Sequence, residues 1–421
     1  MNKFQLAKSR FKKSNDAQVV ARNFGYMLFL QIASYAFPLI TIPYLARVIG
    51  VEGFGKIAFA AAVILWFQTV TEWGFGYTAT RDVAKNKNDL IKISEIFSNV
   101  LWTKIILMIF SLIVLSFLII FIPIFQENKN ILLITFLLIP GNIFFPEWFF
   151  QALERMKFIT YFGVISKFIF TILVFVFVND QGDYLLQPLF ISMGLFFCGL
   201  VSFYLIVAKW GVRIRAPRWK DVFLTIKSGY NVFLNNIFPN LYNSFSTVFL
   251  GLVAGSASTG ILEAGKKFSE IAQQFLNVIS KVFFPLLSRN IKVHDAYGKI
   301  QISLSVCCAL VIFFFAPYLI DFFYTADFNL AAVVLQIMSI SIVFQALNSV
   351  YGTNYLIVLG YEMELRRITT GVSILGFVFS LFFVYYFDII GAAVSITLAR
   401  GFLGVGVLLK AIGIKNKKLK G

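Results

Sequence analysis

Long apolar stretches alternate with short polar ones along the whole chain. Each stretch holds about 18 to 25 apolar residues, which is enough to cross roughly 30 Å of hydrocarbon as a helix. The pattern therefore predicts an all-α polytopic membrane protein with about twelve transmembrane helices, and an even number places both chain ends on the same side. The predicted spans are 23–48, 54–78, 99–122, 131–150, 160–178, 187–208, 229–252, 257–285, 300–323, 330–356, 367–387 and 389–410.

A glycine-rich turn separates the first two spans. Arg47 closes the first apolar run, and Gly50, Glu52, Gly53 and Gly55 form a tight polar turn before the second. Two apolar helices joined so closely must lie antiparallel as neighbours. The pattern returns 205 residues later without gaps: Leu45, Val48, Gly50 and Gly55 fall on Leu250, Val253, Gly255 and Gly260, whereas Arg47 and Glu52 fall on Leu252 and Ala257. We interpret this as an internal repeat.

The repeat divides the chain into two halves of six predicted spans each. The predicted segments are a basic N-terminal segment (1–22), an N-lobe (23–208), a basic linker (209–228), a C-lobe (229–410) and a basic tail (411–421). Because six is even, both halves start on the same side of the membrane, and a two-fold axis that relates them must run along the membrane normal. We expect two six-helix lobes around a central cavity.

Lysine and arginine are distributed very unevenly between the two sets of loops. One set, which includes both termini, carries 28 of these residues, whereas the opposite set carries only Lys56 and Lys129. Positive charge marks the cytoplasmic side, so both termini are expected to be cytoplasmic. The outer loops are too short for an external catalytic domain. The basic segment 209–228 is interpreted as a topogenic linker, with contact to anionic lipid or substrate phosphate as the alternative.

Composition excludes several classes of protein. Only 14% of the residues are charged, against about 25% in soluble domains. The net charge of +17 follows the loops, which favours lipid headgroups over nucleic acid as its partner. The three cysteines lie inside apolar runs and the single histidine, His294, in a short polar loop. We therefore expect no metal site, no cofactor and no catalytic residues, and a protein that is not an enzyme.

Span eight carries the densest set of polar side chains in the apolar part of the chain. Their spacing places them on one helical face about 27 Å long. They are Glu263, Lys266, Lys267, Glu270, Gln273, Gln274, Asn277 and Lys281. Such a face cannot point at lipid, and we favour the interpretation that it lines a cavity. The alternative is pairing within the lobe, Glu263 with Lys267 and Lys266 with Glu270.

Span seven carries a neutral polar stripe at helical spacing, formed by Asn236, Asn240, Asn243, Ser244 and Thr247. Asparagines at membrane depth can bind sugar hydroxyls or join neighbouring helices, and the two interpretations are equally supported. Pro38 and Pro239 fall near the middle of the first span of each half, where each can form a hinge or a static kink.

Other charges lie alone inside predicted spans. Glu72 can carry a coupling ion or neutralise a buried base, with equal support, whereas neutralisation is favoured for Glu147. Arg400 and Lys167 lie too deep to reach the headgroups and are expected to face the interior. Lys104 and Arg47 lie nearer the span ends and are expected to snorkel.

The first turn, Arg47-Val-Ile-Gly50-Val-Glu52-Gly53-Phe-Gly55, resembles the R-x-(L/I)-G-x-E-x-(F/Y)-G signature of bacterial polysaccharide and O-antigen flippases. These are Wzx-type members of the multidrug/oligosaccharidyl-lipid/polysaccharide (MOP) superfamily. The resemblance covers essentially the whole chain in length, spans and loops. It implies two six-helix lobes around a cavity that is often cationic, in the bacterial plasma (inner) membrane.

The resemblance also implies a function. The substrate is an undecaprenyl-pyrophosphate-linked oligosaccharide, turned from the cytoplasmic to the outer face by alternating access. Expected partners are this substrate, membrane lipid and the polysaccharide polymerase and chain-length machinery, with no nucleic acid. The resemblance and the charge pattern together give the candidate residues. The substrate-binding candidates are Lys266, Lys267, Lys281, Arg400, Asn236, Asn240, Gln274 and Asn277. The candidates for H⁺ or Na⁺ coupling are Glu72, Glu263 and Glu270.

Two other functions are open. A multidrug or cation antiporter of the same superfamily would be favoured by an acidic cavity without matching cations. A membrane polysaccharide polymerase also has many spans, but such proteins usually carry a large external loop with catalytic residues, which the short outer loops here do not match.

Overall fold

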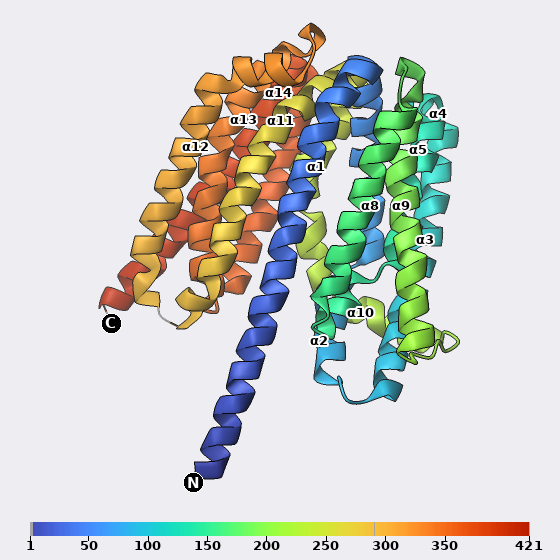
Figure 1. Cartoon of the computed structure of the whole chain (residues 1–421). Helices are drawn as coiled ribbons and strands as arrows, with labels where there is room; N and C mark the ends of the chain where they lie inside the picture. Colours follow the sequence, from blue (N-terminus) through green and yellow to red (C-terminus); the bar gives the residue numbers. More distant parts are fainter. Residues whose placement is uncertain (1–2, 290, 421) are drawn as a thin grey trace. The chain divides into compact units, whose positions relative to one another are not determined.

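The computed structural model describes the backbone of residues 3–289 and 291–420, and every regular element in these ranges is helical. Figure 1 shows the helices as long rods. The elements of the first part are α1 (Lys3–Glu72), α2 (Phe75–Lys85), α3 (Leu90–Phe121), α4 (Pro123–Glu127), α5 (Lys129–Phe136), α6 (Leu138–Phe144), α7 (Glu147–Ala152), α8 (Met156–Phe177), η1 (Gln181–Leu185), α9 (Leu186–Tyr204) and the π-helical η2 (Leu205–Lys209). The others are α10 (Trp219–Ile237), α11 (Asn240–Arg289), η3 (Ile291–Val293), α12 (His294–Phe323), η4 (Ala326–Phe328), α13 (Leu330–Leu347), the π-helical η5 (Asn348–Ile357) and α14 (Glu362–Lys420).

The predicted class, an all-helical protein with many membrane spans, is confirmed. Among the described residues, nine helical stretches are long and apolar enough to cross a membrane. A helix satisfies its own backbone hydrogen bonds, which is required where no water is available. Large apolar side chains point outward along these helices, as on α12, where Phe314, Tyr318 and Phe322 are exposed. An apolar exterior of this kind is suited to lipid rather than to water.

The chain forms two compact units. The first contains Phe67–Asn179, Leu185–Phe233 and the chain up to Tyr44; the second contains Leu45–Trp66, Asp180–Tyr184 and the chain from Leu234 onward. Within the second unit, α11, α12, α13 and α14 lie side by side (Figure 1). The stretch Leu45–Trp66 lies within the predicted N-lobe by sequence, but it packs in the second unit, where it meets the other copy of the repeat.

In each copy of the repeat, a single glycine makes the predicted turn. Gly50 interrupts α1 with φ 67° and ψ −179°, and Gly255 interrupts α11 with φ 81° and ψ −177°. A residue with a Cβ rarely adopts a positive φ, so glycine is needed at both positions. The nearly identical dihedral angles at aligned positions support the internal repeat. A third long helix, α14, is interrupted at Asp388 (φ 47°), between the two spans predicted there.

The two copies of the repeat also pack against each other through matched contacts. A Cβ built on Gly55 would lie 1.7 Å from the carbonyl oxygen of Ser256, and one built on Gly260 would lie 2.4 Å from that of Val51. The 205-residue offset that aligns the repeat converts each contact into the other. The Thr259 hydroxyl donates a hydrogen bond to the Gly55 carbonyl oxygen (3.0 Å). The two helices can therefore approach this closely only because both positions are glycine.

The two prolines considered as hinges differ in their effect. α1 runs through Pro38, and Gly50 is the residue at which its backbone leaves the helical region. Pro239, in contrast, lies between the end of α10 at Ile237 and the start of α11 at Asn240. A proline lacks the N–H group and clashes with the preceding turn, which accounts for the break at Pro239. The helix is therefore broken completely at Pro239 and continues through Pro38.

Candidate functional site

A buried cluster of positive charge lies in the second unit, on α11. The Lys266 ammonium group is 3.1 Å from Glu263 Oε2 and 3.4 Å from the hydroxyl of Thr247. Lys267 is 3.8 Å from the other carboxylate oxygen of Glu263, and its side chain is one-third exposed. The pairing predicted between Glu263 and Lys267 is thus observed, but Lys266 pairs with Glu263 rather than Glu270. One carboxylate serves two lysines, and the carboxylate of Glu270 acts electrostatically on Lys266 and Arg400, so three cations face two acids and positive charge is in excess.

Arg400 of α14 brings a further buried cation into the second unit. Its guanidinium group donates hydrogen bonds to Ser341 Oγ (3.0 Å) and Asn243 Oδ1 (3.1 Å). With its amide oxygen turned toward the guanidinium group, Gln345 also accepts from Nη1 and Nε at 2.8 Å. These partners are all neutral, and the ion pairs among the described side chains do not include Arg400. The expectation that Arg400 faces the interior agrees with its 7% exposure.

The structure separates the remaining candidates by exposure. Gln274, Asn277 and Glu270 are half-buried on α11, and Asn240 is half-buried at its first residue. Lys281 and Asn236 are exposed, Lys281 toward the end of α11 and Asn236 on α10. The polar face of span eight therefore reaches from a buried cluster to an exposed end. Asn243 and Thr247 of the neutral stripe contact the cations of the cluster, which favours a role in supporting it.

Two residues that surround Arg400 were not predicted from the sequence. Ser341 and Gln345 lie on α13, within a predicted apolar span. Gln345 is one of two glutamines in that helix, the other being Gln336. A glutamine at membrane depth is a usable signal, but its connection to Arg400 depends on how α13 packs against α14.

A second set of charges lies in the first unit. Glu72 of α1 accepts two hydrogen bonds from the Lys104 ammonium group, both at 2.8 Å. The Lys104 side chain is only 3% exposed, so the expectation that it snorkels is wrong. A carboxylate within reach offers the ammonium group a partner inside the protein. Arg47, the other residue expected to snorkel, is exposed and donates to the Phe322 carbonyl oxygen (3.2 Å).

This pair gives a prediction about stability. Glu72→Ala should destabilise the protein by about 3–5 kcal/mol, because it leaves the buried Lys104 charge without its partner. Thermal unfolding of the purified protein measures the effect. The double variant Glu72→Gln with Lys104→Met should recover most of the loss, since it removes both charges. An equal loss in the double variant would contradict this account.

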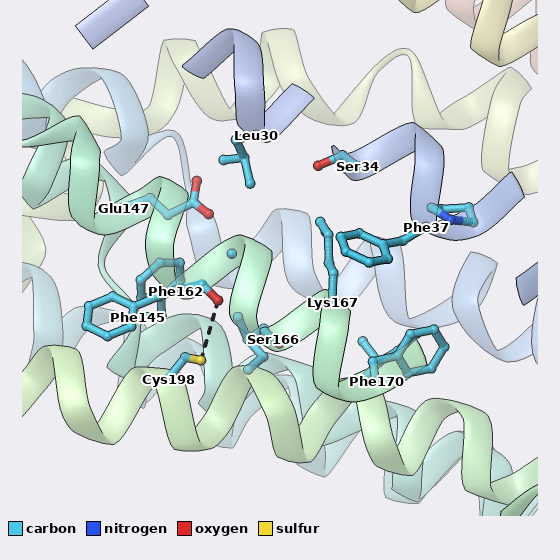
Figure 2. Close-up of a pocket in the computed structure, with 14 residues that line it drawn as sticks. Leu30, Ser34, Phe37, Phe145, Glu147, Phe162, Ser166, Lys167, Phe170 and Cys198 are labelled. Atoms are coloured by element: carbon cyan, nitrogen blue, oxygen red, sulfur yellow. Dashed lines mark hydrogen bonds between the residues drawn. The ribbon is translucent and has the colours of Figure 1, made fainter. Parts of the chain in front are cut away.

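An adjoining cavity in the first unit contains one acid and one base. It has a volume of about 320 Å³ and apolar walls from α1, α8 and α9, with Glu147 and Lys167 as its charged residues. Figure 2 shows both side chains pointing toward the space below Leu30 and Ser34 of α1. Neither forms an ion pair within the described part of the chain. The two charges nevertheless act on each other electrostatically, as Lys104 does on Glu147, which supports the favoured interpretation that Glu147 neutralises a base.

Glu147 also lines a second cavity, of about 330 Å³, together with Glu72, Lys104 and Gln68. It follows Pro146, where the chain is not helical between α6 and α7, so its backbone sits at a break within the membrane-length stretch. The neighbouring Trp148 Nε1 is buried in the wall of this cavity and has no hydrogen-bond partner among the described residues. Glu147 thus stands between two cavities that contain Lys167 on one side and the Glu72–Lys104 pair on the other.

Comparison with known protein families shows the family to which this chain belongs. The family described as "Polysaccharide biosynthesis protein" matches residues 20–291, well over half of the chain. The chain belongs to the polysaccharide biosynthesis protein family. The resemblance inferred from the turn at Arg47–Gly55 is thereby confirmed.

Relatives of this polysaccharide biosynthesis family member extend over nearly the whole chain. The "Putative O-antigen transporter" of Escherichia coli (strain K12) is 27% identical over 406 residues, covering 94% of this chain and 97% of that protein. The protein of the same name from Shigella dysenteriae is 25% identical over 399 residues, covering 93% of this chain and 99% of that protein.

Solved structures share the fold of this family member at low sequence identity. The lipid II flippase MurJ in an inward closed conformation matches with a TM-score of 0.73 at 16% identity, over 93% of this chain and 87% of that chain. A multidrug resistance MATE family transporter of the MOP superfamily, in an inward-facing conformation, matches with 0.63 at 14% identity, over 93% and 99%. The chain therefore shares its fold with these two transporters.

Proposed function

We propose that this protein is a flippase that moves undecaprenyl-pyrophosphate-linked oligosaccharide units, such as those of O-antigen, from the cytoplasmic to the outer face of the bacterial plasma membrane. The observation that carries the proposal is the cluster of Lys266, Lys267 and Arg400 in the second unit. One carboxylate, Glu263, holds two of these cations, and Arg400 is held by neutral groups. A buried excess of positive charge is suited to a multiply charged phosphate group. The names of the two bacterial relatives support the same substrate class.

The remaining candidates are assigned to the glycan and to the substrate path. Half-buried amides can exchange hydrogen bonds with sugar hydroxyls, and the exposed end of the polar face can meet the charged head before it enters. On this proposal Gln274, Asn277 and Asn240 contact the glycan, whereas Lys281 and Asn236 act nearer the entrance. The polyprenyl tail stays in the bilayer.

Twelve spans and cytoplasmic termini complete the proposal. The nine membrane-length stretches become twelve when the three long helices are divided at Gly50, Gly255 and Asp388. Since Lys and Arg are concentrated in the set of loops that includes both termini, we expect both termini to lie in the cytoplasm. In this topology the glycine contact between the two repeat copies lies on the outer side of the membrane. It would close the substrate path in the inward-open state and separate in the outward-open state. Substrate would thus move by alternating access.

Coupling to H⁺ or Na⁺ would require a carboxylate that is free to change its charge. Of the three candidates, Glu72 is held by Lys104 and Glu263 by two lysines, whereas Glu270 is absent from the ion pairs of the described side chains. Glu270 is therefore the candidate of the three that we favour.

The experiment that tests the function uses cells that lack this gene. We expect single lipid-linked repeat units to accumulate with their glycan facing the cytoplasm, out of reach of an impermeant probe added outside. Outward-facing single units that never lengthen would instead identify a polymerase. Normal levels and normal orientation of these units would contradict a role in polysaccharide export.

A second candidate function is a multidrug or cation antiporter. Glu147 favours it, because an acid in a largely apolar cavity is a suitable partner for a lipophilic cation. Against it, Lys167 lines the same cavity. Drug-efflux assays in the same cells discriminate: increased drug sensitivity together with normal repeat-unit export would replace the flippase proposal with this one.

A further inference from the structure

A basic pocket lies in the first unit where α8 begins. It has a volume of about 480 Å³, and its walls come from α1, from the connection between α7 and α8, and from the first turn of α8. Three of its residues are basic and one is acidic, and all four are exposed. The lining includes Arg22, Arg155, Lys157, Glu154, Tyr26 and Phe158. None of them belongs to the cationic cluster of the second unit.

The positive charge of the basic pocket is not neutralised by its own acid. Glu154 Oε1 lies 2.6 Å from the ammonium group of Lys87, a residue outside the pocket lining. Ion pairs among the described side chains do not include Arg22, Arg155 or Lys157. The pocket therefore presents three positive charges, and its one acid is already matched by a fourth base. An anion with more than one charge is the ligand that fits this balance.

Aromatic packing holds one of these cations in place. The Arg155 guanidinium group lies over the ring of Trp210, 4.2 Å from its centroid, and Trp210 packs edge-on against Phe158 (5.5 Å between centroids). A stacked guanidinium group keeps its N–H donors free at the rim, where they can bind phosphate oxygens. Arg155 is also the N-cap of α8, so the partial positive charge of that helix end adds to the three side-chain charges.

The pocket sits at the edge of an apolar surface. α1 and α8 run side by side from it, joined by a hydrogen bond from the Thr160 hydroxyl to the Tyr26 carbonyl oxygen (2.9 Å). Large apolar side chains are exposed within the next two turns of both helices: Phe24 and Phe29 on α1, Tyr161 and Ile165 on α8. A ligand bound here would have a charged head in the pocket and an apolar tail beside it. This chemistry is that of an anionic lipid.

We propose that the basic pocket binds the pyrophosphate group of a polyprenyl lipid at the cytoplasmic surface, before the lipid reaches the cationic cluster of the second unit. The proposal rests on the proposed function for its orientation and its substrate class. Three cations match a pyrophosphate better than the single charge of a common phospholipid. The next basic residue along α8 is Lys167, ten positions or about 15 Å further on, in the cavity that contains Glu147.

The test measures lipid binding by purified full-length protein in nanodiscs. The variant is Arg22→Gln, Arg155→Gln and Lys157→Gln together, and its matched control is Arg81→Gln, Lys85→Gln and Lys92→Gln, three exposed basic residues of α2 and α3 outside the pocket. The probe is undecaprenyl pyrophosphate, titrated against nanodiscs of zwitterionic lipid, with phosphatidylglycerol as the comparison lipid. Loss of charge-assisted bonds should weaken pyrophosphate binding by roughly tenfold or more in the variant and by less than about twofold in the control.

The outcomes separate the possible ligands. A selective loss of pyrophosphate binding supports the proposal, and the single variant Arg155→Gln should show part of the same loss if the triple variant does not fold. Equal weakening of both lipids would make this a general phospholipid site and overturn the proposal. Unchanged pyrophosphate binding would also overturn it. Because binding is measured without export, failure here leaves the flippase function to be judged by the orientation of repeat units in cells.

Discussion

Replacing Lys266 and Lys267 together with alanine should abolish export of lipid-linked repeat units. Each lysine offers a charge-assisted hydrogen bond of about 1.5–3 kcal/mol to a phosphate group, so the double variant should lose roughly 100-fold or more in transport. Arg400 alone would remain in the cluster, and its donors are already engaged by Ser341 and Asn243. Export is measured as outward-facing repeat units in cells that lack the native gene, at matched amounts of protein in the membrane.

Two controls make this loss interpretable. Arg366→Ala with Arg367→Ala removes an adjacent basic pair at the start of α14 and should leave export unchanged. The double lysine variant also leaves the Glu263 carboxylate without its two partners, which can reduce stability. A triple variant that adds Glu263→Gln removes that charge, and it should be equally inactive while accumulating normally. Full export by the double or the triple lysine variant would show that the cationic cluster does not bind the substrate.

The lysine cluster illustrates what the sequence could predict. Charges in an apolar run at helical spacing must share a face and avoid lipid, and this reasoning correctly placed Glu263 and Lys266 in the interior. Their partners on other helices could not be predicted, because they depend on which helices pack together. Ser341 and Gln345, on a helix more than fifty residues from Arg400, became part of the cluster only through the contact of α13 with α14.

Tertiary contacts also decided how the isolated charges are placed. Lys104 was expected to reach the headgroups because it lies near a span end, but its ammonium group is buried and lies 2.8 Å from a carboxylate oxygen of Glu72. Glu147 was expected to neutralise a base, and it faces a cavity shared with Lys167, whose charge acts on it without the contact of an ion pair. Distance along the chain gives the depth of a charge in the membrane, but not the side chains that surround it.

The turn between the first two spans was predicted in position but not in mechanism. Several glycines close together, with Glu52, were interpreted as forming a tight polar turn. In the structure Gly50 alone makes the turn, and Gly55 continues the helix and allows the close approach of Ser256. The matched behaviour of Gly255 and Gly260 gives the sequence repeat a physical meaning: one glycine of each copy reverses the chain, and the other holds the two copies together.

This close contact gives the second prediction with a large effect. Gly55→Ala and Gly260→Ala should each reduce export by at least about tenfold, because the added Cβ would lie 1.7 Å and 2.4 Å from a backbone oxygen that cannot yield without moving its helix. Helix propensity alone would make the alanine variants more stable by about 1 kcal/mol. A loss of export would therefore come from the helix contact and not from a weakened helix. The control is Gly371→Ala in α14, where a Cβ would meet nothing within 4 Å.

A labelling experiment tests whether the contact closes the outer side of the path. Thr259 is fully buried in this contact, so Thr259→Cys, placed in a background with Cys198, Cys307 and Cys308 replaced by alanine, should resist an impermeant maleimide added outside the cell. Adding Gly55→Ala should separate the two helices and expose the thiol, with a marked rise in labelling, whereas adding Gly371→Ala should not. Equal labelling with and without Gly55→Ala would mean that the glycine contact is not an outer closure. In that case the matched glycines would serve only to pack the two repeat copies, and the step that opens the path would have to occur elsewhere in the chain.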